Sequence, residues 1–205
     1  MAEFGLSFVE IGATMTVFFV VSAVGQAMAG FGVDRFGALR ILLAGISCFV
    51  LAGLGLAMAT SSSALYAVAA LAGLGNTVFH PADFTVLNRH VSPPRLGHAF
   101  SVHGLSGNLG WAAAPLFLTG LATLVGWRVA AASTIFVAIP AMLLLWHNRA
   151  LLDTGHHAHA AKQSGHGTFD FMRVGAVWLC FAFFFLITAA FGAIQNFATP
   201  ILQNL

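Results

Sequence analysis

The sequence predicts an all-α integral membrane protein, folded as a bundle of about six transmembrane helices. Of its 205 residues, 59% are apolar and only 7% are charged, whereas a soluble domain carries about 25% charged residues. Six apolar stretches are each long enough to cross a hydrocarbon core of about 30 Å at about 1.5 Å per residue. We predict spans at Ile11–Ala29, Ile41–Thr60, Ala64–Leu87, Ala99–Val125, Val129–Trp146 and Val174–Ile194.

The connections between these spans alternate in charge, and the alternation predicts an orientation. Cations occupy every second connection, as Arg35 with Arg40, Arg89 with Arg95, and Arg149 with Lys162 and Arg173. The intervening connections are uncharged Thr60–Ser63 and Gly126–Arg128, so Arg128 is the one cation on the opposite side. The positive-inside rule assigns the cationic side to the cytoplasm. Both chain ends then lie outside, which we interpret as a missing N-terminal span.

Composition argues against several other classes of protein. The eight Lys and Arg residues do not cluster, so we expect no nucleic-acid partner. Cys48 and Cys180 both lie within apolar spans and suit small packing residues, not a disulfide or a metal site. The segment between the fifth and sixth spans contains four histidines that we interpret as part of a solvated connector, namely His156, His157, His159 and His166. We therefore predict no cofactor and no bound metal.

The connection between the first two spans carries a spaced motif, Gly30-Phe-Gly-Val-Asp34-Arg35-Phe-Gly37-Ala-Leu-Arg40. It resembles the signature loop of the major facilitator superfamily, whose members are secondary transporters. The resemblance implies a gating role, in which Asp34 pairs with a cation or helix end of an opposing half. Gly30 and Gly37 would permit close helix approach and a tight reversal. The alternative is a cationic turn that only fixes topology.

A second set of motifs lies in the middle of the chain: Gly75-Asn-Thr-Val-Phe-His-Pro-Ala-Asp83, then Val91–Ala99 and Val102–Trp111. This run resembles the fosmidomycin-resistance branch of the same superfamily, whose members have twelve spans in two halves. The resemblance implies that this chain supplies the second to seventh spans. Residues 1–146 would be an N-terminal half without its first helix, 147–170 a cytoplasmic linker, and 171–205 the first helix of the other half. Two departures are that Tyr66–Ala72 lacks the usual Arg and that Ala114-Pro115 replaces a Gly-Pro pair.

Polar residues inside the third and fourth spans are the candidate substrate and proton site. Asn76, His80 and Asp83 are spaced four and three apart, which predicts one shared helix face, and Pro81 predicts a kink beside them. A short loop would bring His103 to a similar depth, with Asn108 further along. Ionisable groups in a membrane face a bundle interior or a wet cavity. Either they titrate or bind an anionic group, or Asp83 and His80 only pair with neighbouring helices.

We therefore predict a proton-coupled exporter of a small polar or drug-like molecule, an antiporter of the bacterial inner (plasma) membrane associated with fosmidomycin-type resistance. Its expected partners are that molecule, the lipid bilayer and the missing transporter half. One alternative is a truncated fragment that is inactive without that half. Another is an intramembrane serine protease, because Gly104-Leu-Ser106-Gly107 is a protease-like motif. Such an enzyme needs a histidine on a later helix, and the fifth and sixth spans contain none.

Overall fold

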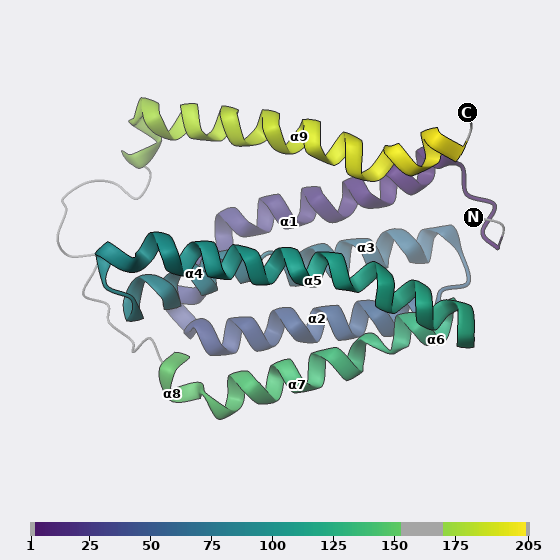
Figure 1. The fold of residues 1–205 in the computed structure, drawn as a ribbon, viewed down its shortest axis with the longest axis horizontal. Coiled ribbons are helices and arrows are strands. Elements are labelled where there is room, and N and C mark those ends of the chain that lie inside the picture. The colour runs from purple at the N-terminus through teal and green to yellow at the C-terminus, as the bar shows by residue number, and fades with distance from the viewer. Residues whose placement is uncertain (1–2, 153–169, 204–205) are drawn as a thin grey trace. The chain divides into compact units, whose positions relative to one another are not determined.

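The computed structural model describes residues 3–152 and 170–203, and every regular element in those ranges is a helix (Figure 1). The first three spans are α1 (Phe8–Phe36), α2 (Ala38–Met58), and α3 (Ser62–Asn76) continued by α4 (Phe79–His90). The next are η1 (Pro93–Arg95) with α5 (Leu96–Val125), and α6 (Trp127–Ala132) with α7 (Thr134–His147). The remaining elements are α8 (Arg149–Leu152), η3 (Asp170–Arg173) and α9 (Gly175–Gln203).

Six of these helical segments have the length and hydropathy needed to span a membrane, which confirms the predicted number of spans. The helices are longer than the apolar stretches that predicted them. The first candidate span, for example, is Phe8–Phe36 and includes Asp34 and Arg35. A helix continues past the hydrocarbon boundary because its backbone hydrogen bonds are internal and do not depend on the side chains being apolar.

The chain divides into two compact units, residues 1–157 and 158–205. The boundary falls within the predicted linker, 147–170. The four linker histidines lie outside the described residues, as does Lys162. In the second unit, η3 leads into α9, and the Trp178 indole donates to the Met172 carbonyl at 2.6 Å.

Within the first unit, the helices alternate in direction. In Figure 1 the α1–α2 turn, the α4–η1–α5 connection and α8 lie at the left end, and the α2–α3 and α5–α6 connections lie at the right end. The left end therefore carries Arg35, Arg40, Arg89, Arg95 and Arg149. We call it the cationic end. Arg128, in the first turn of α6, lies at the opposite end.

Small residues allow the central helices of this unit to pack closely. Helix α2 packs against α3, α6 and α7, and α1 packs against α3. A Cβ atom built on Gly45 would lie 2.9 Å from the Gly75 carbonyl, so the α2 and α3 backbones touch there. Near the α1–α2 turn, a buried cluster of Val33, Ala38, Leu42 and Ala82 joins α1, α2 and α4. Packing of small residues holds membrane helices together because lipid supplies no hydrophobic driving force between them.

Helix α5 is attached differently from the others. It contacts mainly α6, with a smaller contact to α4, and none of its residues is buried. Its large apolar side chains are exposed, including Leu105, Leu109 and Leu116 at 59%, 62% and 79%. An apolar helix face of this kind suits lipid or a further helix.

Candidate functional site

A break in the third span positions the candidate site. Helix α3 ends at Asn76 and α4 begins at Phe79. The Thr77 hydroxyl and the Thr77 backbone N–H both donate to the Leu74 carbonyl, at 2.7 and 3.2 Å, at the end of α3. Pro81 falls in the first turn of α4, where a missing N–H costs nothing. The kink predicted from Pro81 is therefore present as an interruption of the helix.

The short connection Val91–Arg95 reverses the chain and lays α5 alongside α4. This hairpin brings the His103 Nε2 atom of α5 to 3.6 Å from the Asp83 Oδ2 atom of α4. Both side chains are part-buried, with exposures of 34% and 28%. The predicted meeting of Asp83 and His103 at a similar depth is thus observed. This contact places a carboxyl and an imidazole from different spans close enough to share a proton.

His80 belongs to the same region through an aromatic ring. Its imidazole lies 5.6 Å from the centroid of Phe84. The other side of this contact is His103, at 6.2 Å from Phe84, and Phe100 packs edge-on at 5.1 Å. His80 is exposed. Phe84 is therefore a common neighbour of the two histidines.

Asn76 makes a contact with α1 that its spacing does not predict. Its side-chain amide donates to the Ser22 hydroxyl of α1 at 2.8 Å, and Gln26 donates to the same oxygen at 3.0 Å. Ser22 is 2% exposed. Asn76 therefore forms a hydrogen bond between α1 and α3. The helix is interrupted after Asn76, and the shared helix face of Asn76 with His80 and Asp83 stays a prediction.

Asn108 lies on α5 about 7 Å beyond His103 along the helix axis. Its side chain is exposed and makes no hydrogen bond to any residue in the described ranges. The structure therefore places Asn108 on the same helix as the pair without joining it to the pair.

The motif at the α1–α2 turn is more helical than predicted. Asp34 and Arg35 form the last turn of α1, and only Gly37 breaks the helix, with φ 84° and ψ 153°. A side chain is strongly disfavoured at these angles, so the tight reversal predicted at Gly37 is observed. Gly30 has open space around a built Cβ atom. The close helix approach predicted there is absent from the part of the chain that the structure describes.

The charged groups of this motif are exposed. Arg35 lies over the Phe36 ring at 5.4 Å, and Arg40 is in the first turn of α2. Asp34 pairs with no cation in residues 3–152 and 170–203. A gating contact made by Asp34 to another half remains a prediction.

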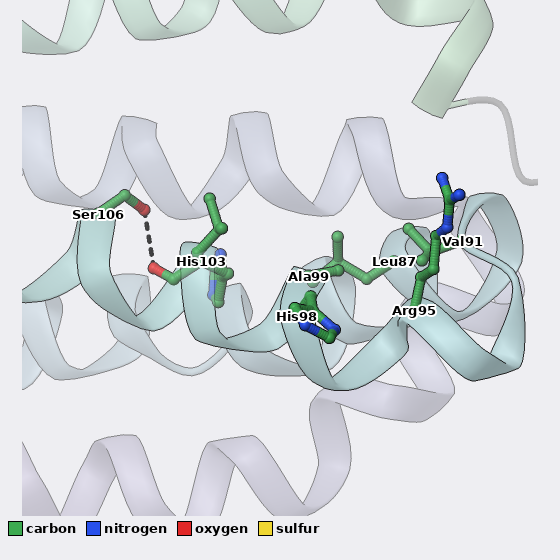
Figure 2. Close-up of a pocket in the computed structure, with 8 residues that line it drawn as sticks. Leu87, Val91, Arg95, His98, Ala99, His103 and Ser106 are labelled. Atoms are coloured by element: carbon green, nitrogen blue, oxygen red, sulfur yellow. Dashed lines mark hydrogen bonds between the residues drawn. The ribbon is translucent and has the colours of Figure 1, made fainter.

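A groove of about 520 Å³ lies between α4 and α5 at the cationic end. Figure 2 draws the residues that line it. Arg95, His98 and His103 are its charged or titratable lining residues, and Leu87 and Val91 form part of its apolar wall. Ser106 closes the far end. Its hydroxyl donates to the His103 carbonyl at 2.7 Å, within its own helix. Ser106 is thus bonded to backbone and not to an imidazole, which disfavours the protease alternative.

Sequence reasoning missed a polar cluster at the opposite end of the unit. The Glu3 carboxylate accepts from Arg128 at 2.6 Å and from the Trp127 indole at 2.8 Å. Arg128 also donates to the carbonyls of Ala57 and Ala59, at 2.8 Å each. These carbonyls lie at the end of α2, where helical partners run out. In the sequence, Arg128 is the one cation on the side opposite the others. That exception was the signal from which this polar cluster could have been predicted.

The Arg128 cluster affects the ionisation of Glu3. Hydrogen bonds from Arg128 and then Trp127 hold the pKa of the Glu3 carboxyl below its ordinary value of 4.5. Arg128 also lies over the Trp127 ring, with 4.4 Å between its guanidinium carbon and the ring centroid. Its charge is therefore balanced by a carboxylate, two carbonyls and an aromatic face, which explains how a lone cation is accommodated at this end.

This arrangement of apolar spans, an interrupted helix and a part-buried titratable pair is that of a multi-pass membrane protein. The Major Facilitator Superfamily profile matches residues 1–205, and the chain belongs to that family. Helical fold, membrane location and family thus agree with the sequence prediction. The bacterial origin of the relatives indicates the plasma membrane.

Three relatives show how much of a complete family member the chain represents. It is 38% identical over 116 residues to the fosmidomycin resistance protein of Escherichia coli, covering 56% of this chain and 28% of that protein. It is 30% identical over 128 residues to a multidrug resistance protein B homolog of Mycobacterium tuberculosis, covering 62% and 24%. It is 33% identical over 162 residues to a probable 4-methylmuconolactone transporter of Cupriavidus pinatubonensis, covering 77% and 37%. The alignments thus span between 24% and 37% of these relatives.

Proposed function

We propose that this chain supplies part of a proton-coupled exporter for a small polar or drug-like molecule. The observation that carries the proposal is the contact of Asp83 and His103 across two adjacent spans at 3.6 Å. Ionisable side chains inside membrane spans are costly and usually serve an ion or substrate pathway. Family membership supports transport as the activity. The names of the relatives from E. coli and M. tuberculosis support resistance by efflux, with a fosmidomycin-type compound as the first substrate to test.

The chemistry of the pair explains how a proton would be coupled to movement of the helices. Histidine gains or loses a proton near neutral pH. When His103 is protonated it attracts the Asp83 carboxylate and draws α4 and α5 together. When His103 is neutral, that attraction falls, and the Asp83 carboxylate can accept a proton or separate from His103. His80, which also neighbours Phe84, is the second group that can bind an anionic substrate or titrate.

The test uses a full-length relative, such as the E. coli fosmidomycin resistance protein, substituted at the positions that align with this chain. We expect His103→Gln and Asp83→Asn each to lower drug resistance about tenfold or more at equal membrane abundance, as loss of a proton-transfer group does. His90→Gln is the matched control, because His90 is an exposed histidine at the end of α4. Unchanged resistance and unchanged drug-driven proton release in proteoliposomes would refute the proposal.

We propose a separate gating role for the α1–α2 motif, in which Asp34 contacts a helix of the other transporter half. Its support is the resemblance of the motif together with the exposure of Asp34 at the end of α1. In a full-length relative, Asp34→Asn should reduce transport while leaving drug binding unchanged. Glu10→Gln is the control, because Glu10 is an exposed carboxylate bonded locally to Ser7. Equal transport by the two variants would refute the gating role.

We also propose that the working transporter contains helices beyond those of this chain, with residues 1–146 as most of one half and residues 171–205 as the start of the other. The greater length of the relatives and the exposed apolar side chains of α5 support this proposal. A cysteine introduced at Leu109 should cross-link to a partner span in a full-length relative. Substrate uptake by liposomes containing only this chain, at the rate of a full-length relative, would contradict it.

A further inference from the structure

The interruption of the third span weakens the backbone connection between its two parts. Two residues, Thr77 and Val78, separate α3 from α4. Pro81 stands four positions after Thr77, and because proline has no N–H, the Thr77 carbonyl has no helical donor. The Val78 carbonyl keeps its bond from the Ala82 N–H, at 3.0 Å. The direction in which α4 leaves α3 therefore depends on side-chain packing as well as on backbone hydrogen bonds.

Both side chains of the interruption pack against glycines of neighbouring helices. The Thr77 methyl group overlaps the position that a Cβ atom on Gly25 of α1 would take, and the Thr77 Cβ atom is 2.8 Å from that position. The Val78 Cγ2 atom does the same at Gly45 of α2. Thr77 is 3% exposed. The absence of a side chain at each glycine thus provides the space that Thr77 and Val78 occupy.

The orientation of the Thr77 side chain is fixed by hydrogen bonding. Its hydroxyl and its backbone N–H both donate to the Leu74 carbonyl, at 2.7 and 3.2 Å. The hydroxyl and the methyl group share one Cβ atom, so rotating the methyl group away from Gly25 would break the hydroxyl bond. A methyl group added at Gly25 must therefore displace the Thr77 backbone or break this bond.

The position of Asp83 is sensitive to the packing of Thr77. Asp83 lies six residues beyond Thr77, which corresponds to about 9 Å along a helix, so a change of about 10° in the direction of α4 would move it by about 1.5 Å. Its contact with His103 is already 3.6 Å long, and a shift of this size would separate the two groups. Helix α5 is not bound to follow α4, because it packs mainly against α6.

We propose that Thr77 is a positioning residue for the Asp83–His103 pair, and that its methyl group, packed against Gly25, sets the direction of α4. The inference rests on the proposed function of that pair and adds to it two residues that do not titrate. It predicts compensation, because Gly25→Ala adds one methyl group and Thr77→Ser removes one while retaining the hydroxyl. Each single substitution should disturb the pair, and the double substitution should restore it.

The first experiment reads the geometry of the pair in the full chain, without any transport. Asp83→Cys and His103→Cys are introduced after the two native cysteines are replaced by alanine, and dibromobimane, which fluoresces only after bridging two nearby thiols, reports the bridging rate. Gly25→Ala should lower this rate about fivefold and Thr77→Ser about twofold, and the double substitution should restore it. Thr77→Ser only removes a methyl group, so it tests the proposal even if Gly25→Ala does not fold. Unchanged bridging in Thr77→Ser, or additive losses in the double variant, would overturn the proposal.

Gly73→Ala is the matched control for general loosening between α1 and α3. Its Cβ atom would lie 2.5 Å from the Phe18 carbonyl oxygen, so it disturbs the same two helices through backbone. Thr77→Ser removes no atom from that collision and should not restore a bridging rate lowered by Gly73→Ala. Equal rescue of Gly73→Ala and Gly25→Ala by Thr77→Ser would overturn the specific contact.

The second experiment measures transport by a full-length relative that carries glycine and threonine at the positions aligned with Gly25 and Thr77. We expect Gly25→Ala to lower the maximal rate about tenfold with little change in the half-saturating substrate concentration, and Thr77→Ser to restore the rate. If bridging in the chain responds as expected but transport is insensitive to Asp83→Asn, the proposed function fails and the positioning contact stands. If transport requires Asp83 but Gly25→Ala leaves the maximal rate unchanged, the positioning role is wrong and the proposed function stands.

Discussion

Replacing Arg128 by Met should destabilise the first unit more than loss of any other described arginine in it. Arg128 joins three segments, because its guanidinium contacts Glu3 before α1, two carbonyls at the end of α2, and the ring of Trp127 in α6. Methionine retains most of the apolar stem but supplies no donor. The substitution therefore removes the polar contacts while leaving the packing nearly unchanged.

The expected cost comes mainly from the two carbonyls. A hydrogen bond from a charged donor contributes about 1.5–3 kcal/mol, and leaving a buried acceptor without a donor costs about 1–3 kcal/mol. Ala59 is 2% exposed, so water cannot readily replace Arg128 there. The two bonds share one nitrogen, Nη1, so their contributions do not simply add. We expect a loss of about 2–3 kcal/mol in the free energy of unfolding, whereas the exposed ion pair to Glu3 adds little.

The assay is reversible unfolding of the full chain in mixed micelles, followed by helical circular dichroism as the denaturing detergent increases. Arg128→Lys should recover only part of the loss, because an ammonium lacks the forked geometry that reaches several acceptors together. Arg89→Met is the matched control, being exposed and without an ion pair in the described ranges. If Arg128→Met costs no more than Arg89→Met, the capping role is wrong.

Acid should weaken the same cluster through Glu3. The pKa of Glu3 is lowered in the folded state. The contacts of its carboxylate with Arg128 and Trp127 therefore stabilise the fold fully above the ordinary glutamate pKa of 4.5, and this stabilisation is lost as pH falls through the lower folded value. Wild-type stability should therefore fall over this acid range more steeply than that of Glu3→Gln, measured in the same unfolding assay. A Glu3→Gln variant with the same acid dependence as wild type would contradict the assignment.

Three further predictions concern packing and backbone geometry, all measured by the same unfolding assay. Gly73→Ala should cost about 1–3 kcal/mol, because its Cβ atom would lie 2.5 Å from a backbone carbonyl of α1, whereas Gly104→Ala, in open space, should not destabilise. Gly37→Ala should cost about 1–3 kcal/mol because its φ is 84°, whereas Gly30→Ala, in a helix with open space, should stabilise slightly. Asn76→Leu should cost about 1 kcal/mol by breaking the bond between α1 and α3. Equal costs within either glycine pair, or a neutral Asn76→Leu, would refute the corresponding reasoning.

Individual residues show where sequence reasoning about the site worked and where it failed. Asp83 and His103 could be paired in advance, because a short loop between antiparallel spans fixes the depth of both. The hydrogen bond from Asn76 to Ser22 could not be predicted, because spacing along one helix does not show which neighbouring helix faces it. The partners of Arg128 were equally hidden. Glu3 is 125 positions away, and backbone carbonyls at the end of α2 carry no side-chain signal.

The amino-acid sequence by itself determined the membrane class, the number of spans and the end at which most cations gather. These properties depend on the transfer of apolar and charged groups between water and lipid, which each segment undergoes almost independently. Only the tertiary structure decided which polar groups meet: Asp83 with His103, Asn76 with Ser22, and Arg128 with the end of α2. Such contacts depend on helix breaks, rotations and close approach between distant segments, which hydropathy does not encode.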